Sequence, residues 1–153
     1  MPDINPVWQE ELWIGTVYSD STWTYKKLCA GIQGAPWSSN EQIQQYFFMC
    51  GNGFAHNEVT GIAPEIQVTG RRVVGDDAQD YIMSKQFALG ANRKSSVKYI
   101  ANGKQYVADC TICDIVCFGG ESTDGSPFSC NIRLNGAPTV TDYPPAQAVT
   151  NPQ

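Results

Sequence analysis

The sequence of 153 residues predicts a mainly β fold, an antiparallel β-sandwich or barrel with one short flanking α-helix. About seven or eight β-favouring runs, several with alternating apolar and polar positions, are separated by turn residues. Only one segment combines helical spacing with a capping residue. The length suits one domain over residues 1–153, with an irregular N-terminal arm over about residues 1–10 and an extended C-terminal tail over about residues 137–153.

In the first half of the chain, strands are expected over residues 12–18 and 23–28, and residues 54–74 alternate again. Residues 38–50 are ambiguous. Ser39 with Gln42 three positions later resembles a capping box, whereas the apolar run over residues 46–50 suits a buried strand ending near Cys50. We favour the strand.

The helix is predicted over residues 76–84. Asp76 is a capping residue with Gln79 three positions later, and carboxylates in the first turn favour the helix dipole. Because Tyr81 and Ile82 share a face with Ala78, we expect them to pack the helix against the outside of the sheet.

The second half gives the clearest strand signals. A strand over residues 96–101 leads through Asn102-Gly103, a strong hairpin signal, into a long run over residues 104–118. That run would be about 50 Å long if it were straight, so a bulge or bend is expected. A loop over residues 119–127 and a final strand over residues 128–134 follow.

Composition argues against several classes of function. The net charge is −5 and basic residues occur only in isolated pairs, so tight nucleic-acid binding is not expected. The N-terminus lacks the basic and apolar segments of a signal peptide, and no apolar run is long enough to cross a bilayer. We therefore expect cytoplasmic synthesis and no membrane partner.

No catalytic, cofactor-binding or metal-binding residue is predicted. His56 is the single histidine and is placed in a loop. Strand alternation would put Cys113 and Cys117 on one face and Cys110 on the other, which opposes a four-thiolate metal site. In a reducing compartment, free thiols are expected for all six cysteines, namely Cys29, Cys50, Cys110, Cys113, Cys117 and Cys130.

Residues 69–82, TGRRVVGDDAQDYI, resemble major tail tube proteins of tailed phages and prophages. The hairpin, long strand, Gly119-Gly120 and closing strand over residues 95–138 are similar to the same family, and the resemblance covers roughly residues 54–138. It implies a structural virion protein whose hexameric rings stack into a hollow tube for DNA passage during ejection. The tube would be the tail of the virion, assembled in the host cytoplasm.

The resemblance also implies partners: further copies of the chain, a tape measure protein, and tail tip and tail terminator proteins, with genomic DNA passing through the lumen unbound. Such rings stack through a long loop. We expect that loop within residues 31–53, the longest stretch with weak strand character, with Trp37 as its anchor beside Ser38, Ser39 and Asn40.

Three other hypotheses remain open on the sequence. A capsid decoration or head–tail joining protein would also be acidic and rich in β structure. A carbohydrate-binding module would use Trp13 or Trp37 as a stacking platform. A metal or redox protein would use Cys110, Cys113, Cys117 and Cys130.

Overall fold

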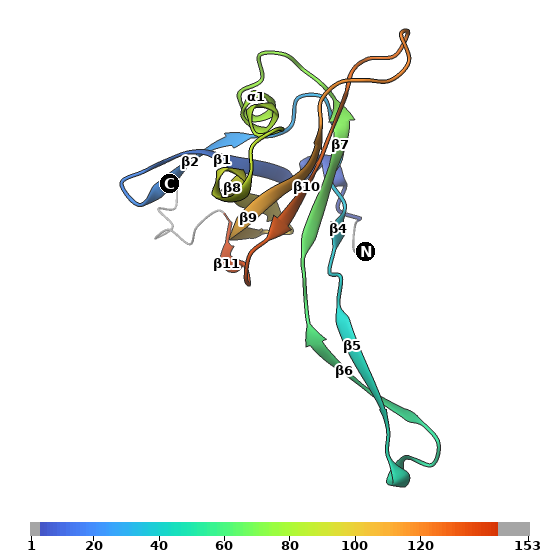
Figure 1. Ribbon diagram of the computed structural model, residues 1–153. Coiled ribbons are helices and arrows are strands. Elements are labelled where there is room, and N and C mark those ends of the chain that lie inside the picture. The colour runs from blue at the N-terminus through green and yellow to red at the C-terminus, as the bar shows by residue number, and fades with distance from the viewer. Residues whose placement is uncertain (1–3, 144–153) are drawn as a thin grey trace.

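The computed structural model describes residues 4–143. Its body is one nine-stranded antiparallel sheet, curled into a half-barrel, in the order β2-β1-β8-β9-β10-β7-β3 with β4 and β11 beside this path (Figure 1). A two-stranded sheet, β5 and β6, forms a long hairpin that leaves the body. The body strands are β1 (Glu11–Ser19), β2 (Thr22–Lys27), β3 (Ile32–Gly34), β4 (Trp37–Ser38), β7 (Glu65–Arg71), β8 (Lys94–Ala101), β9 (Lys104–Val116), β10 (Pro127–Leu134) and β11 (Thr139–Asp142).

The predicted fold class is confirmed, in the form of a single curled sheet with one short helix. Consecutive residues of a strand point to opposite faces, and burial follows this period. In β10, Phe128, Cys130 and Ile132 are buried while the residues between them are partly exposed. Ile66 and Val68 of β7 lie fully buried in the same core. Burying each such side chain contributes about 1.5–3 kcal/mol, so this one apolar face holds the curled sheet together.

The bulge expected in the long strand is present in β9. Its register against β10 shifts between the pairs Ser129↔Val116 and Asn131↔Cys113. Asp114, inside this irregularity, has a φ of 52°, which is uncommon for a residue with a side chain. An extra residue in a strand reverses which of the following side chains point toward the core and which point outward. The bulge therefore decides which side chains of β9 reach the core.

Part of the predicted C-terminal tail is ordered as β11. Residues 139–142 pair with the first residues of β9, from Thr139↔Val107 to Asp142↔Lys104. The segment expected to be an extended tail thus begins with a paired strand, because β10 pairs only with the later part of β9 and leaves the earlier edge free. Unpaired backbone groups on a strand edge favour the addition of a strand. Residues 144–153 of the tail lie outside the described residues, as do residues 1–3 of the N-terminal arm.

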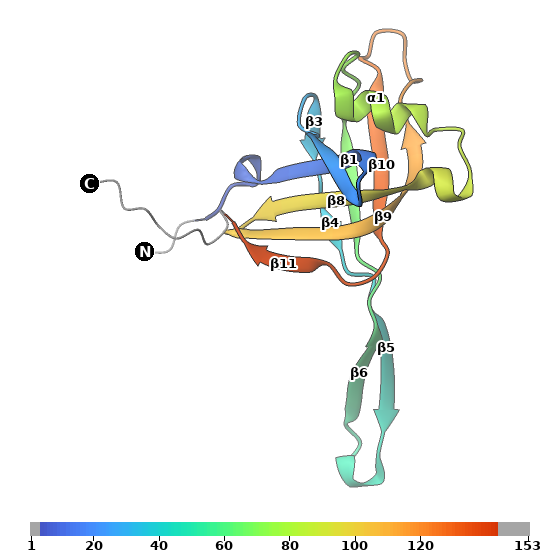
Figure 2. The ribbon, with the colours of Figure 1, turned by 90° about the vertical axis from the view of Figure 1, so that its left-hand side faces the viewer.

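The predicted helix is α1 (Asp77–Ser84), which lies across one end of the sheet against β1, β2 and β9 (Figure 2). Asp76 caps it by accepting a hydrogen bond from the backbone N–H of Gln79 at 3.2 Å. Ile82 is fully buried in the core, and Tyr81 is half-buried against it. No helix in residues 4–143 is both long and apolar enough to cross a membrane.

The segment over residues 31–53, in which the stacking loop is expected, has more strand structure than its weak strand character indicates. This segment contains β3, β4 and β5 (Gln42–Phe47) and ends in a 3₁₀ turn, η2 (Met49–Gly51). The partner strand is β6 (Ala55–Gly61), which lies inside the predicted run over residues 54–74. Two further 3₁₀ turns, η1 (Val7–Gln9) and η3 (Gly90–Arg93), precede β1 and β8. The pairing with β6 and β7, which lie further along the chain, supplies the strand structure that the local sequence only weakly favours.

Candidate interaction site

The β5–β6 hairpin stands away from the body and is exposed along both strands (Figures 1 and 2). Every residue of β5 is exposed, and so is every residue of β6 except Gly61. An isolated two-stranded hairpin is at best marginally stable in water, because it has no apolar layer to bury. The hairpin is therefore the part of the molecule that would gain most from contact with a partner.

Polar side-chain contacts occur across the shaft of the hairpin and along one of its strands. The Gln45 side-chain amide donates to Asn57 at 3.3 Å, and Nε2 of His56 lies 2.5 Å from a Glu58 carboxylate oxygen. His56 is thus an exposed strand residue and does not lie in a loop as predicted. Its polar partner is on its own strand, two residues away, so this contact does not link the two strands.

The end of the hairpin is apolar and uncharged. We call residues 46–54 the hairpin tip. Asn52 and Gly53 form its turn with φ values of 52° and 85°, in the left-handed region that Asn and Gly tolerate. Tyr46 and Phe48 stack with their ring centroids 5.8 Å apart. The tip carries five exposed large apolar side chains, which are Tyr46, Phe47, Phe48, Met49 and Phe54. Met49 is completely exposed, at 101% of its reference area.

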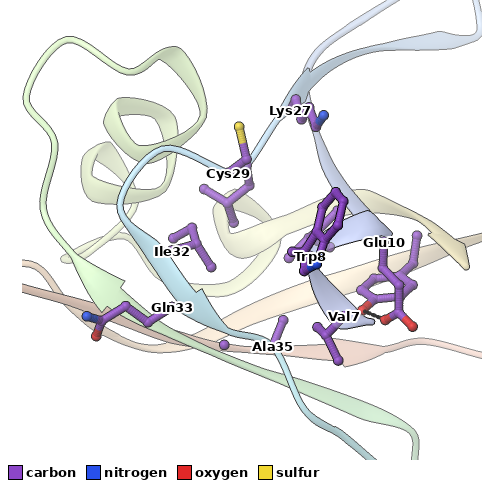
Figure 3. A pocket seen from close by; sticks show the side chains of 12 residues that line it. Val7, Trp8, Glu10, Lys27, Cys29, Ile32, Gln33 and Ala35 are labelled. Carbon is purple, nitrogen blue, oxygen red and sulfur yellow. Dashed lines mark hydrogen bonds between the residues drawn. The ribbon is translucent and has the colours of Figure 1, made fainter. Parts of the chain in front are cut away.

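A cleft on the body is formed where η1 faces β3 and the segment before it, and we call it the η1–β3 cleft. Its volume is about 330 Å³. Figure 3 shows Cys29 and Ile32 on one side of the cleft and Val7 and Trp8 on the other. Val7 and Trp8 are themselves largely exposed, so this surface is apolar and open to solvent.

Both charged side chains that line the η1–β3 cleft already have partners. The Tyr99 hydroxyl donates to a Glu10 carboxylate oxygen at 2.5 Å, and the Lys27 ammonium lies 3.5 Å from Glu11. Burial, together with this hydrogen bond to Glu10, raises the pKa of Tyr99 above its ordinary value and keeps the phenol protonated. The cleft therefore presents an apolar floor with its charges satisfied.

The predicted stacking-loop residues lie at the base of the hairpin. Trp37 and Ser38 form β4 and pair with β7, and the Trp37 ring contacts Tyr99 edge-on with centroids 5.2 Å apart. The Asn40 amide donates to the Ala63 carbonyl at 3.1 Å and links the two sides of the base. Trp37 thus contacts two aromatic rings of its own chain but keeps 39% of its surface exposed. A contact of Trp37, Ser38, Ser39 or Asn40 with a second ring of subunits stays a prediction.

Neither the hairpin tip nor the η1–β3 cleft was predicted from the sequence. A signal for the tip was present, since the apolar run over residues 46–50 and Phe54 flank the turn formed by Gly51, Asn52 and Gly53. By itself the run predicts a buried strand, because apolar side chains are usually buried. The cleft has no local signal, because it forms only when η1 meets residues some 20 positions later in the chain.

The two aromatic rings proposed for sugar binding differ in how far they are covered. The Lys98 ammonium lies 4.8 Å from the centroid of the Trp13 ring and 4.7 Å from that of Tyr25. Trp37 packs edge-on against Tyr99 and also approaches Tyr106. Sugar stacking needs a free aromatic face. Lys98 lies over the Trp13 ring, whereas Trp37 keeps 39% of its surface exposed, so sugar stacking on Trp37 stays a hypothesis.

The cysteines differ from the predicted arrangement. Because of the bulge in β9, Cys110 and Cys117 both reach the core, where Cys130 joins them, while Cys113 is half-buried. The expectation that Cys110 faces away from Cys117 is therefore wrong. Burial raises the pKa of Cys110 and of Cys130 to about 12, so these thiols stay protonated. No group of side chains suited to a metal ion occurs among residues 4–143.

The motif over residues 69–82 joins the helix to the sheet. Gln79 is fully buried, and its amide nitrogen donates to the carbonyls of Ala30 at 2.7 Å and Arg71 at 3.1 Å. Its amide oxygen accepts from the backbone N–H of Val73 at 2.7 Å. The Arg72 guanidinium donates to Asp80 at 2.5 Å and so holds the pKa of that carboxyl below its ordinary value. These residues have a structural role, since their polar atoms bind one another and the backbone.

Comparison with known proteins gives similarity of fold only. No protein-family model matches the chain, and no curated protein matches its sequence. One similar solved structure is the tail of an empty GTA particle with C6 symmetry, with a TM-score of 0.73 and 11% identity, covering 90% of this chain and 99% of that one. Another is the cap that terminates the tube of the anti-feeding prophage, with a TM-score of 0.56, 12% identity and 93% coverage of both chains. The chain therefore has a tail-tube-like fold.

Proposed function

We propose that this chain is a non-enzymatic structural subunit of a phage tail or phage-tail-like particle, and that it builds the tail tube. Copies of the chain form rings of six, and the rings stack into a hollow tube. The fold similarity to a C6-symmetric tail supports this proposal because it spans nearly the whole of both chains. The fold alone does not determine function, so the proposal depends on the interaction surfaces of this molecule.

The single observation that carries the proposal is the exposed β5–β6 hairpin with its apolar tip. A monomer gains little from holding such a hairpin in water. When one surface meets a different surface on the next copy, and the contact does not close on itself, the copies form an extended assembly. The sheet also ends in β2 and β3, whose open edges offer pairing surfaces between neighbours in a ring.

The remaining partners follow from the same proposal. The particle tail is the location of the protein, after assembly in the host cytoplasm. A tape measure protein, a tail tip and a tail terminator would set the length and ends of the tube. Genomic DNA would pass through the lumen without specific binding, which the net charge of −5 supports because like charges do not adhere.

A second candidate is a tube-terminating cap, favoured by the similarity to the anti-feeding prophage cap. A cap would form a single ring and would not polymerise. The higher TM-score of the tail structure, 0.73 against 0.56, favours the tube.

The test is direct observation of the assembly. The purified protein is concentrated in buffer and in ammonium sulfate, which strengthens apolar association, and examined by negative-stain electron microscopy and sedimentation. The control variant replaces residues 46–56 with Asn-Gly, a turn that closes a two-stranded hairpin. We expect hollow tubes from the natural chain and folded, unstacked protein from the control. Isolated six-fold rings would instead support the cap, and monomers in every condition would contradict both functions.

A further inference from the structure

We propose that the hairpin tip of one copy inserts into the η1–β3 cleft of a second copy in the next ring. This inference rests on the proposed function and names the surface that receives the hairpin. The occupant of the cleft is thus the tip of an identical chain.

The hairpin tip and the η1–β3 cleft match in chemistry. The tip has no charged side chain and exposes Phe48 and Met49 at its end. The cleft is lined by Val7, Trp8 and Ile32, and its two charged groups are already paired within the chain. Because the tip carries no charge, its entry into the cleft does not require a charged group to leave water. The charged groups of the cleft keep their partners within the chain, so no unpaired charge is buried there.

The sizes also match. A cleft of about 330 Å³ lies at the small end of the range for sites that take compact groups, and it is too small for a folded element. The tip ends in the 3₁₀ turn over Met49–Gly51 and the turn residues Asn52 and Gly53, so a few side chains would enter while the strands remain outside. Buried aromatic and methionine anchors of this kind are typical of the centre of an interface.

The geometry requires two molecules. The hairpin extends away from the body, whereas η1 and β3 lie on the body beyond the hairpin base (Figures 1 and 2). The six residues of β5 alone span about 20 Å, which keeps the tip far from the cleft of its own chain. Because the tip and cleft are different surfaces, each copy can receive one tip and offer another. The contact is therefore heterologous and continues from ring to ring.

The chain carries its own reporter for this contact. Cys50 lies in the hairpin tip and Cys29 in the lining of the η1–β3 cleft, and both are exposed free thiols. A disulfide forms only when two Cα atoms lie within about 7 Å of each other. A Cys29–Cys50 bond between copies would therefore report insertion of the tip.

In the first experiment, assembled tubes are treated with copper(II) phenanthroline. Two thiols lose their protons and form the S–S bond, and two copper(II) complexes each accept one of the two electrons released and become copper(I). The products are separated on a non-reducing denaturing gel and the linked peptides are identified by mass spectrometry. We expect a ladder of dimers, trimers and longer chains, because each copy is linked at both cysteines. Cys29→Ser and Cys50→Ser should each assemble and each abolish the ladder.

The second experiment tests the contact without a covalent bond. Met49→Glu should raise the protein concentration needed for tube formation by about tenfold or more, since a carboxylate cannot enter an apolar cleft. Adding Gln33→Lys, an exposed position in the cleft lining, should recover most of that loss. The matched control adds Asn92→Lys on η3, outside the cleft lining, and should recover none.

The outcomes separate this inference from the proposed function. Tubes whose Cys50 links only to Cys50, giving dimers and no ladder, would overturn the inference while the tube function stands. Tubes with no link at Cys50, together with equal rescue by Gln33→Lys and Asn92→Lys, would do the same. Failure of the natural chain to form any ring or tube would overturn the function and the inference together.

Discussion

Replacing Gly70 with Ala should destabilise the body by pushing β3 away from β7. Gly70 pairs with Ile32 across these two strands. A Cβ atom placed on Gly70 would lie 2.2 Å from the Gly31 carbonyl oxygen and 2.8 Å from the Ile32 Cα atom. All the nearest atoms belong to the backbone, so no side chain can rotate to make room.

The expected magnitude follows from that distance. The added methyl group would be about 1 Å too close to the Gly31 oxygen for an ordinary contact, and overpacking of this kind costs about 1–3 kcal/mol. Moving β3 would also lengthen the 2.7 Å hydrogen bond from the Arg71 N–H to the Gly31 carbonyl, a further loss of about 1 kcal/mol. We expect unfolding free energy to fall by about 2–4 kcal/mol and Tm by roughly 4–15 °C.

The assay is urea unfolding of the dilute monomer, followed by circular dichroism. Gly34→Ala is the matched control on the facing strand, because its added Cβ would meet only the Thr69 hydroxyl oxygen, at an ordinary 3.5 Å. The control should change stability by less than about 0.5 kcal/mol or raise it slightly. A Gly70→Ala variant as stable as the natural chain, or a control that loses as much, would refute the steric reasoning.

Three further predictions concern the helix junction and the thiols. Gln79→Leu removes a fully buried amide that binds three backbone groups and should lower the free energy of unfolding by about 3 kcal/mol in the same urea assay, whereas a near-neutral result would contradict the role of the amide. The pKa of Asp80 is lowered by Arg72, so its stabilisation is present at neutral pH and is lost as pH falls below about 4. The Tm difference between the natural chain and Asp80→Asn should therefore shrink between pH 7 and pH 3, and a constant difference would exclude this linkage. Ellman's reagent at pH 8 should react quickly with the exposed thiols of the monomer and should reach the core thiols only when the protein unfolds. Rapid reaction of the core thiols in the folded protein would contradict their burial. The exposed pair is Cys29 and Cys50, and the core thiols are Cys110, Cys117 and Cys130.

Several features of the molecule are fixed by local sequence. The Asn102-Gly103 turn forms as predicted because both residues tolerate the positive φ values, 53° and 75°, that a tight hairpin needs. The cap at Asp76 is equally local, since a carboxylate three residues before a free N–H stabilises the first turn in any context. The strands of the second half show clear alternation because one face of each is buried.

Tertiary structure decided the features on which function depends. The weakly strand-forming segment over residues 31–53 became β3, β4 and β5 because β7 and β6 supplied backbone partners. The bulge near Asp114 reversed the facing of Cys117 relative to Cys110, and a period-two pattern cannot show where such an extra residue will fall. The apolar run beside Cys50 was assigned to a buried strand, yet the fold carries it out into solvent.

The sequence by itself determined a mainly β chain with one capped helix, no visible catalytic or metal chemistry, and a likeness to tail tube proteins. These properties depend on residues close together in the chain, where periodicity, turn chemistry and capping act directly. The hairpin tip, β11 and the η1–β3 cleft were decided only by the tertiary structure. Each depends on which distant segments meet and which side chains they leave uncovered, and that depends on long-range pairing and burial.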